Sequence, residues 1–268
     1  MANYTAADVK KLREETDAPM MECKTALDEA DGNYDRAKEI LREKGKAAAA
    51  KRVDRSTAAG VVAFATNEGA TKLGGVVVEC ETDFVARNED FIAIAQQVAE
   101  IVLNSGENDP KIKELLEGAV AKIRENIRLA KAVSLSTSGK FLTYVHHDKT
   151  KGAAVEVSGA SNDEAVRKIA IQAVAFPPEV LNRADLSQAS IDKEIEVETK
   201  RAIEEGKPEN IAANIAKGRV NKEFITKVVL MEQLYYADQS KSVSQYLAES
   251  AKGSKVESFV YLAVGQNG

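Results

Sequence analysis

The sequence predicts an α+β protein in which a three-helix N-terminal domain precedes two repeated subdomains and a helical hairpin arm. A length of 268 residues predicts two or three domains, each with its own core. Two patterns point to this fold: a series of short helices interrupted by turn residues at the N-terminus, and a strand-turn-strand-helix pattern that occurs twice in the middle of the chain. Each copy of that pattern predicts a small antiparallel sheet packed by helices.

Composition excludes several classes of protein. The chain has 37 lysines and arginines against 42 aspartates and glutamates, a net charge of −5, and its aromatic residues amount to 5% with no tryptophan. A mildly acidic chain with few stacking side chains argues against direct binding of nucleic acid. Cys23 and Cys80 are the only cysteines and form no C-x-x-C pair, which disfavours a disulfide framework and a zinc site.

Neither a membrane segment nor a signal peptide is predicted. No stretch approaches the roughly 18 consecutive apolar residues of a membrane span. The N-terminus also lacks the apolar region of a secretory signal. We therefore expect a cytoplasmic protein that does not act in a membrane.

Residues 1–45 predict a domain of three helices. Thr5 begins a Thr-x-x-Asp capping pattern for the first helix, and Pro19 suits the first position of the second. Gly45 is placed to end the third helix. The following residues, 46–57, are rich in alanine and basic side chains but poor in apolar surface, so they predict a linker with a solvated surface.

Residues 58–138 predict the first repeated subdomain, and 139–180 together with 226–268 predict the second. In each copy a turn joins two strands, and an asparagine followed by acidic residues opens a helix. The asparagine can cap the first amides of the helix, and the acidic residues oppose its dipole. In copy one the strands are 60–66 and 75–80, Asn88 opens the helix, and the helix is 91–103. In copy two the strands are 141–146 and 153–157, Asn162 opens the helix, and the helix is 165–175.

Copy one has a longer connection between its second strand and its helix. Residues 81–87 number seven, whereas the corresponding 158–161 number four. The longer connection contains Thr82-Asp83-Phe84-Val85, and it exposes apolar area unless something covers it. Either Phe84 folds back into its own domain, or it projects and contributes ~2–3 kcal/mol when a partner buries it.

The remaining segments predict further helices and one more part of the second sheet. Residues 110–129 have an apolar face at helical spacing, and 190–205 with 209–219 predict a helical hairpin within an arm at 181–225. Because the apolar seam of this hairpin is thin, we expect the arm to dock on another surface or to associate with a second copy as a homodimer. The tail is expected to complete the second sheet through strand-like residues 228–236, a helix at 242–250 and a strand at 259–264.

No catalytic constellation is present in the sequence. His146 and His147 are the only histidines, and neighbouring side chains on a strand point to opposite faces, which disfavours a metal site. A G-x-S-x-G motif is absent. The glycines of 69–74 have the spacing of a phosphate loop without its lysine and hydroxyl residue, so a hairpin turn explains them better. These observations predict a binding protein, without covalent chemistry and without a cofactor.

The chain carries, in this order, the motifs Leu12-Arg13-Glu14-Glu15-Thr16, Met20-Met21-Glu22-Cys23-Lys24, Leu41-Arg42-Glu43-Lys44-Gly45, Thr82-Asp83-Phe84-Val85-Ala86-Arg87-Asn88, Tyr144-Val145-His146, Gly206-Lys207-Pro208 and Gly218-Arg219. Together they resemble the bacterial translation elongation factor Ts family. The resemblance runs from about residue 4 to residue 264. It implies that the three-helix domain is UBA-like.

The resemblance implies a guanine nucleotide exchange factor for elongation factor Tu, the GTPase that delivers aminoacyl-tRNA. It also implies that the three-helix domain contacts a helix of the GTPase domain, which makes Leu12, Met20 and Met21 candidate interface residues. Core packing is the alternative for the two methionines, and we expect one of them to face inward.

Residues 82–85, here termed the 82–85 segment, match the part of the family that intrudes beside the switch region and disturbs the magnesium site. The resemblance gives this role to Asp83 and Phe84, with support from Thr82 and Val85. It implies that the second copy contacts the more distal domains of the GTPase, with His146 as a candidate contact. A hydrogen-bonded strand histidine is the alternative for His146.

Two other classes of function stay open at this point. The first is an adaptor that binds another protein or RNA without exchange activity. The second is an enzyme that uses Cys80 or His146.

Overall fold

Two three-stranded antiparallel sheets form the centre of the molecule. The computed structural model describes residues 3–16, 18–50, 52–159 and 162–266. One sheet has the order β1-β2-β3 and the other β4-β5-β8. Their strands are β1 (Ala59–Thr66), β2 (Lys72–Cys80), β3 (Arg128–Ser136), β4 (Lys140–Val145), β5 (Lys151–Gly159) and β8 (Ser254–Ala263).

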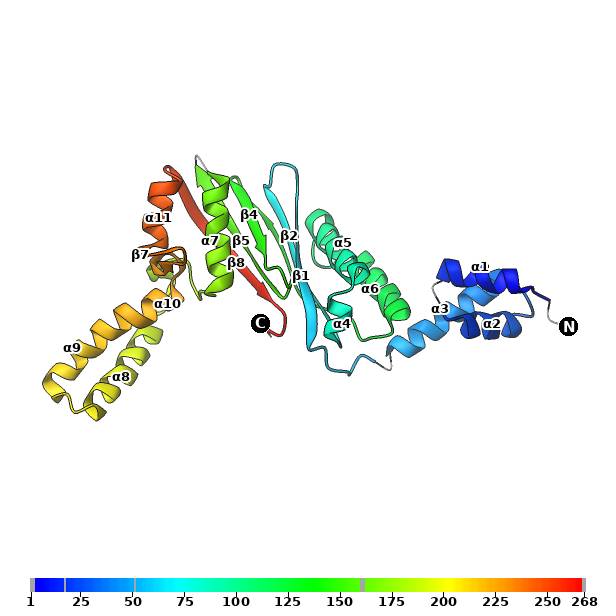
Figure 1. Cartoon of the computed structure of the whole chain (residues 1–268), viewed down its shortest axis with the longest axis horizontal. Helices are drawn as coiled ribbons and strands as arrows, with labels where there is room; N and C mark the ends of the chain where they lie inside the picture. The colour runs from blue at the N-terminus through cyan, green and yellow to red at the C-terminus, as the bar shows by residue number, and fades with distance from the viewer. Residues whose placement is uncertain (1–2, 17, 51, 160–161, 267–268) are drawn as a thin grey trace.

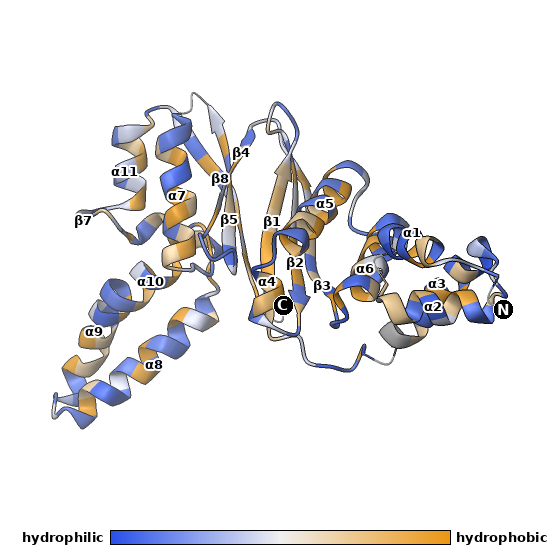
Figure 2. Ribbon diagram, turned by 45° about the vertical axis from the view of Figure 1, so that its right-hand side comes forward, coloured by the Kyte–Doolittle hydropathy of each residue, from blue (hydrophilic) through white to orange (hydrophobic). Residues whose placement is uncertain are grey.

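The two sheets face each other, and helices cover their outer sides (Figure 1). Helix α5 (Glu89–Ser105) lies on the first sheet with α6 (Pro110–Ile123) beside it, and α7 (Asp163–Ala175) lies on the second sheet with α11 (Val243–Ser250). Val62 and Val77 of the first sheet meet Leu262 of the second in one buried cluster. Because both faces are covered, β1 and β2 are largely buried, and much of each strand is apolar (Figure 2).

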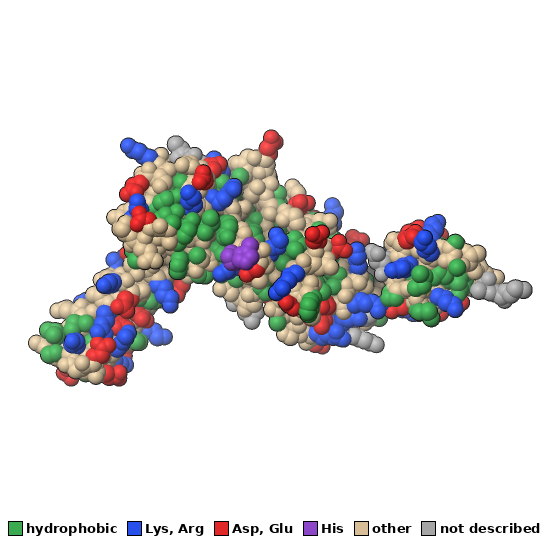
Figure 3. Space-filling view, in the orientation of Figure 1, with side chains coloured by type: hydrophobic (Ala, Val, Ile, Leu, Met, Phe, Trp, Pro, Cys, Tyr) green, Lys and Arg blue, Asp and Glu red, His purple; other side chains and the backbone are tan. Residues whose placement is uncertain are grey.

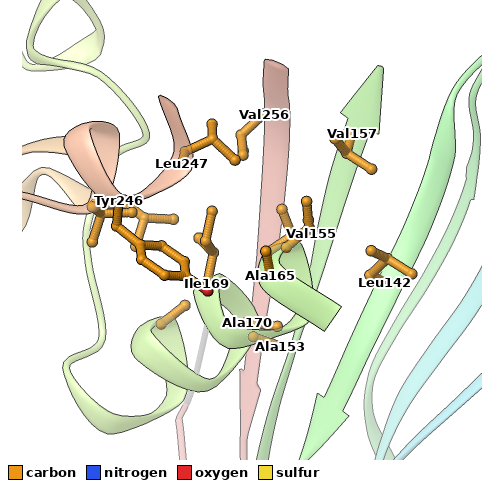
Figure 4. Close-up of a cluster of buried hydrophobic side chains, with 14 of the residues drawn as sticks. Leu142, Ala153, Val155, Val157, Ala165, Ile169, Ala170, Tyr246, Leu247 and Val256 are labelled. Carbon is orange, nitrogen blue, oxygen red and sulfur yellow. The ribbon is translucent and has the colours of Figure 1, made fainter. Parts of the chain in front are cut away.

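The core of the second subdomain is shown in Figure 4. Ile169 of α7 and Leu247 of α11 lie in one buried cluster with Val155 and Val256 of the sheet. Apolar side chains on these two helices therefore hold them against β4-β5-β8. Burying each such side chain contributes about 1.5–3 kcal/mol.

The strand-strand-helix plan of both copies is confirmed, and so are its capping asparagines. The Asn88 side chain accepts a hydrogen bond from the Asp90 N–H at 2.8 Å, and Asn162 accepts one from the Ala165 N–H at 3.3 Å. Part of the predicted connection 158–161 lies outside the described residues, namely 160 and 161. The predicted completion of the second sheet by a C-terminal strand is also confirmed, since β8 pairs with β5.

The three-helix unit lies at one end of the elongated molecule and the arm at the other (Figure 1). The unit consists of α1 (Ala6–Thr16), α2 (Met20–Glu29) and α3 (Tyr34–Ala50), and the arm of α8 (Gln188–Glu204) and α9 (Glu209–Arg219). Short elements connect the arm to the second subdomain: 3-10 turns at Arg183–Asp185 and Leu230–Glu232, a π-helical turn at Val220–Ile225, α10 (Thr226–Val228), β6 (Leu234–Tyr235) and β7 (Asp238–Ser242). The domain boundaries given above stay predictions.

Two predictions about the N-terminal helices are wrong in detail. Pro19 occupies the cap position before α2 instead of the first helical position. Helix α3 does not end at Gly45 but continues to Ala50, because the alanines that follow have the highest helix propensity. Gly45 lies within the helix, where a β-carbon would only touch the Ala121 side chain of α6 at 3.4 Å, an ordinary packing distance.

Two further segments differ from the prediction. The helix predicted over 110–129 ends at Ile123, and Arg124 adopts a left-handed conformation that leads into the unpredicted strand β3. Since β3 is a half-exposed edge strand, its apolar pattern is weak. The predicted strand 228–236 is instead broken into short pieces: residue 228 ends α10, 230–232 form a 3-10 turn and only Leu234–Tyr235 form a strand, because a short buried apolar run such as Val228-Val229-Leu230 has no periodicity that separates a strand from a helix.

The glycines of 69–74 are not all explained by a turn. Gly69 lies in the hairpin turn, but Gly74 lies within β2. A β-carbon on Gly74 would stand 2.3 Å from the Ala99 carbonyl oxygen of α5. Gly74 therefore allows the helix to pack directly on the strand.

Candidate partner-binding site

The connection after β2 folds into a short helix that presents one aromatic side chain to solvent. Helix α4 (Asp83–Ala86) is capped by Thr82, whose hydroxyl oxygen accepts a hydrogen bond from the Val85 N–H at 3.4 Å. Val85 is half-buried and packs on the core of the first subdomain, whereas Phe84 is 84% exposed. Phe84 therefore projects into solvent and does not fold back into its own domain.

Hydrogen bonds hold the base of α4 in place. The Glu125 carboxylate accepts one from the Thr82 hydroxyl at 2.6 Å and one each from the backbone N–H groups of Glu81 and Thr82, both at 3.0 Å. The Cys80 thiol donates to the Thr82 carbonyl oxygen at 3.3 Å. An exposed ring on an ordered support loses little conformational freedom when a partner covers it.

Asp83 places a carboxylate next to the exposed ring. Its Oδ2 lies 3.1 Å from the Arg87 guanidinium, and both side chains are largely exposed. An exposed pair of this kind contributes only about 0–1 kcal/mol. Asp83 can therefore exchange Arg87 for a charged group of a partner at little cost.

The two thiols are unsuited to nucleophilic chemistry. Burial, together with the nearby negative charge of Glu125, raises the pKa of Cys80 to about 12. Burial also raises the pKa of Cys23, which lies in the core of the N-terminal unit. Since the thiolate is the reactive form, neither residue is available as a nucleophile at neutral pH.

The histidines lie differently from the prediction. Strand β4 ends at Val145, so His146 and His147 belong to the turn that follows, and their rings contact each other with centroids 4.2 Å apart instead of pointing to opposite faces. The Tyr144 hydroxyl lies 3.3 Å from His146 Nδ1. Figure 3 shows the pair at the surface of the second subdomain, where His146 is half-buried and His147 exposed.

The three candidate residues of the N-terminal unit separate into two groups. Met20 is 44% exposed and Met21 is 69% exposed, so the expectation that one of them faces inward is wrong. Leu12 is completely buried with Cys23 and Leu27 between the helices. Leu12 therefore belongs to the core of the N-terminal unit and does not itself offer a side chain to a partner.

One turn brings the N-terminal unit and the base of α4 together. Arg124, at the end of α6, donates a hydrogen bond of 2.5 Å to Glu22, the neighbour of Met21. The next residue, Glu125, holds Thr82. Neither contact was predicted, because each joins residues far apart in the sequence. His146 lies on the other subdomain and does not join this group.

Two features that other functions require are missing from the described residues. Within the ranges that the structure describes, no group of three or more histidine, cysteine, aspartate or glutamate side chains could hold a metal ion. No helix in the same part of the chain is long and apolar enough to cross a bilayer.

The chain has a mixed α and β fold, with Phe84, Met20 and Met21 exposed on its surface. Comparison with known proteins then gives the family. Residues 81–266 match the family model described as elongation factor TS. Elongation factor Ts of Thiobacillus denitrificans is 40% identical over 278 residues, covering 99% of this chain and 93% of that protein.

Two further relatives agree. Elongation factor Ts of Clostridioides difficile is 38% identical and covers 99% of this chain and 94% of its own length. That of Clostridium perfringens is 38% identical and covers 92% of this chain and 87% of its own length. The chain belongs to the elongation factor Ts family.

Proposed function

We propose that this protein is a guanine nucleotide exchange factor that promotes release of GDP from elongation factor Tu during translation elongation. The observation that carries the proposal is Phe84, which is 84% exposed on a helix that Val85 and Ala86 anchor to the core. A phenylalanine on an ordered support loses little conformational entropy when a partner buries it, so it is suited to insertion into another protein.

In the proposed mechanism, the 82–85 segment enters the GTPase beside its switch region. The Phe84 ring acts as an apolar wedge, and the exposed carboxylate of Asp83 is brought close to the magnesium site of the partner. The magnesium ion is among the largest local charges at a phosphate site, so disturbing its surroundings weakens nucleotide binding. No covalent step is required, and the protein acts without a cofactor of its own.

The mechanism has a thermodynamic requirement. If the protein weakens nucleotide binding by ~10⁴-fold, the coupling free energy is ~5.5 kcal/mol, and nucleotide must weaken binding of this protein by the same factor. The wedge needs only to be better accommodated in the nucleotide-free state of the GTPase. Burial of one phenylalanine supplies part of this amount, and the disturbed metal site supplies the rest.

The other candidate contacts follow the same proposal. Met20 and Met21 are exposed on the N-terminal unit, which we take to be UBA-like, and they bind a helix of the GTPase domain. Half-buried His146 contacts the more distal domains of the GTPase. We place the protein in the cytoplasm, expect no direct contact with nucleic acid, and assign self-association as a homodimer to the arm.

Release of labelled GDP from elongation factor Tu tests the proposal. The release rate is measured with and without this protein at matched magnesium concentration. We expect the protein to accelerate release by several orders of magnitude at saturation. Binding to elongation factor Tu with unchanged release would instead indicate an adaptor, and no binding at all would overturn the proposed partner.

A further inference from the structure

We propose that Glu125 is a positioning residue whose carboxylate sets the orientation in which the 82–85 segment presents Phe84. The inference rests on the proposed function, because it concerns the efficiency of the same wedge. Glu125 does not lie in the segment and comes 43 residues after Thr82 in the sequence.

Three donors of the segment's base converge on this one side chain. Oε2 of Glu125 accepts hydrogen bonds from the N–H groups of Glu81 and Thr82, and Oε1 accepts from the Thr82 hydroxyl. The same Thr82 hydroxyl oxygen caps α4 by accepting from the Val85 N–H. Glu125 therefore holds the Thr82 hydroxyl in place, and this hydroxyl in turn caps α4. The position of the carboxylate thus sets where α4 begins.

The backbone around Glu125 is shaped for this contact. Arg124 has a φ of 67°, a left-handed conformation that ends α6 and turns the chain toward the exit of β2. Asn126, the residue after Glu125, donates its N–H to the Glu81 carboxylate at 2.6 Å. Its side-chain amide also donates to the carbonyl oxygens of Val53 and Arg55, at 3.1 and 2.8 Å. The position of Glu125 is thus held from both sides.

Little else fixes the direction of α4. The helix is a single turn of four residues, too short to be stable by itself. Its other anchors include the apolar contacts of Val85 and Ala86 with the core, the weak thiol hydrogen bond of Cys80, and the Asn88 N–H, which donates to the Val85 carbonyl oxygen at 2.9 Å. Apolar contacts hold the segment close to the core but allow it to rotate, whereas a carboxylate with three donors is directional.

The first test measures the segment in the free protein by hydrogen–deuterium exchange of peptides that cover residues 81–90. In Glu125→Ala we expect exchange of this region to become roughly tenfold faster. Glu125→Gln keeps an acceptor oxygen for the two N–H groups, so it should restore most of the protection. Glu114→Ala, which removes an exposed glutamate of α6 that makes no side-chain hydrogen bond within the described residues, is the matched control and should behave as the wild type. Unchanged exchange in Glu125→Ala would overturn the proposal.

The second test measures release of labelled GDP from elongation factor Tu over a range of concentrations of each variant. We expect Glu125→Ala to lower the maximal rate roughly tenfold and to change the half-saturating concentration less, with partial recovery in Glu125→Gln. In the Phe84→Ala background the same substitution should have almost no further effect, because it acts through Phe84. A general loss of structure would not produce this non-additivity.

The outcomes separate the two proposals. If the wild type accelerates release and Glu125→Ala does so equally well, or if its effect is fully additive with Phe84→Ala, the positioning role is wrong while the proposed function stands. If the wild type does not accelerate release, the proposed function fails, and a role for Glu125 in serving it fails with it.

Discussion

Phe84→Ala removes the side chain on which the proposed mechanism depends, and its expected effect can be worked out from exposure. Because Phe84 is 84% exposed, truncation should change the free energy of unfolding by less than about 0.5 kcal/mol. Nearly the whole ring is available for burial by a partner, which is worth about 2–3 kcal/mol. That amount corresponds to a loss of roughly 30–150-fold in stabilisation of the nucleotide-free complex.

The assay is stopped-flow release of labelled GDP from elongation factor Tu, together with thermal unfolding of each variant. Phe176→Ala is the matched surface control, since Phe176 is 51% exposed on the second subdomain and is not one of the proposed contact residues, and it should leave release unchanged. Phe91→Ala is the matched core control, since Phe91 is fully buried and its truncation should cost about 3–5 kcal/mol of folding free energy. Full activity in a folded Phe84→Ala protein would refute the wedge.

Three further predictions concern other parts of the molecule. Met21→Ala should weaken binding to elongation factor Tu by roughly tenfold in a calorimetric titration without lowering the unfolding temperature. Met20→Ala should have a smaller effect because less of that side chain is exposed. Unaltered binding in both variants would exclude the methionines from the interface with elongation factor Tu. Gly74→Ala should destabilise the fold by about 1–3 kcal/mol in urea unfolding, since the added β-carbon would stand 2.3 Å from the Ala99 carbonyl oxygen; wild-type stability would contradict that packing. The pKa of Cys80 is raised from 9.0 to about 12 in the folded state, so the contribution of the protonated thiol to stability is complete below pH 9.0 and is lost as the pH rises toward 12. The urea concentration at the unfolding midpoint should therefore fall with pH over this range, and it should fall less steeply in Cys80→Ala. An equal dependence on pH in the two proteins would contradict the raised pKa of Cys80.

Local sequence signals predicted much of the fold. Asn88 and Asn162 mark their helix starts because a cap acts on amides two or three residues away. The projecting Phe84 could be proposed because the comparison of two copies revealed extra residues in one of them. The two repeated hairpins were recognisable because their apolar runs are long and bounded by turns.

Contacts between distant segments could not be predicted in the same way. Met20 and Leu12 both fit an apolar helical pattern, and only the packing of three helices shows that Leu12 is inside and Met20 outside. The strand β3 was missed because an exposed edge strand lacks an apolar signature. Glu125 resembles any other charged residue in the sequence, and its importance appears only when the fold brings it to Thr82.

The central claim, that this protein and nucleotide oppose each other on elongation factor Tu, is tested most directly by the affinity of the protein for two states of the GTPase. Its Kd is measured by calorimetry for nucleotide-free elongation factor Tu and for the same protein saturated with GDP and magnesium. The mechanism predicts much tighter binding to the nucleotide-free state, by a factor equal to that by which this protein weakens GDP binding. Equal affinity for the two states would contradict the mechanism, however tightly the proteins bind.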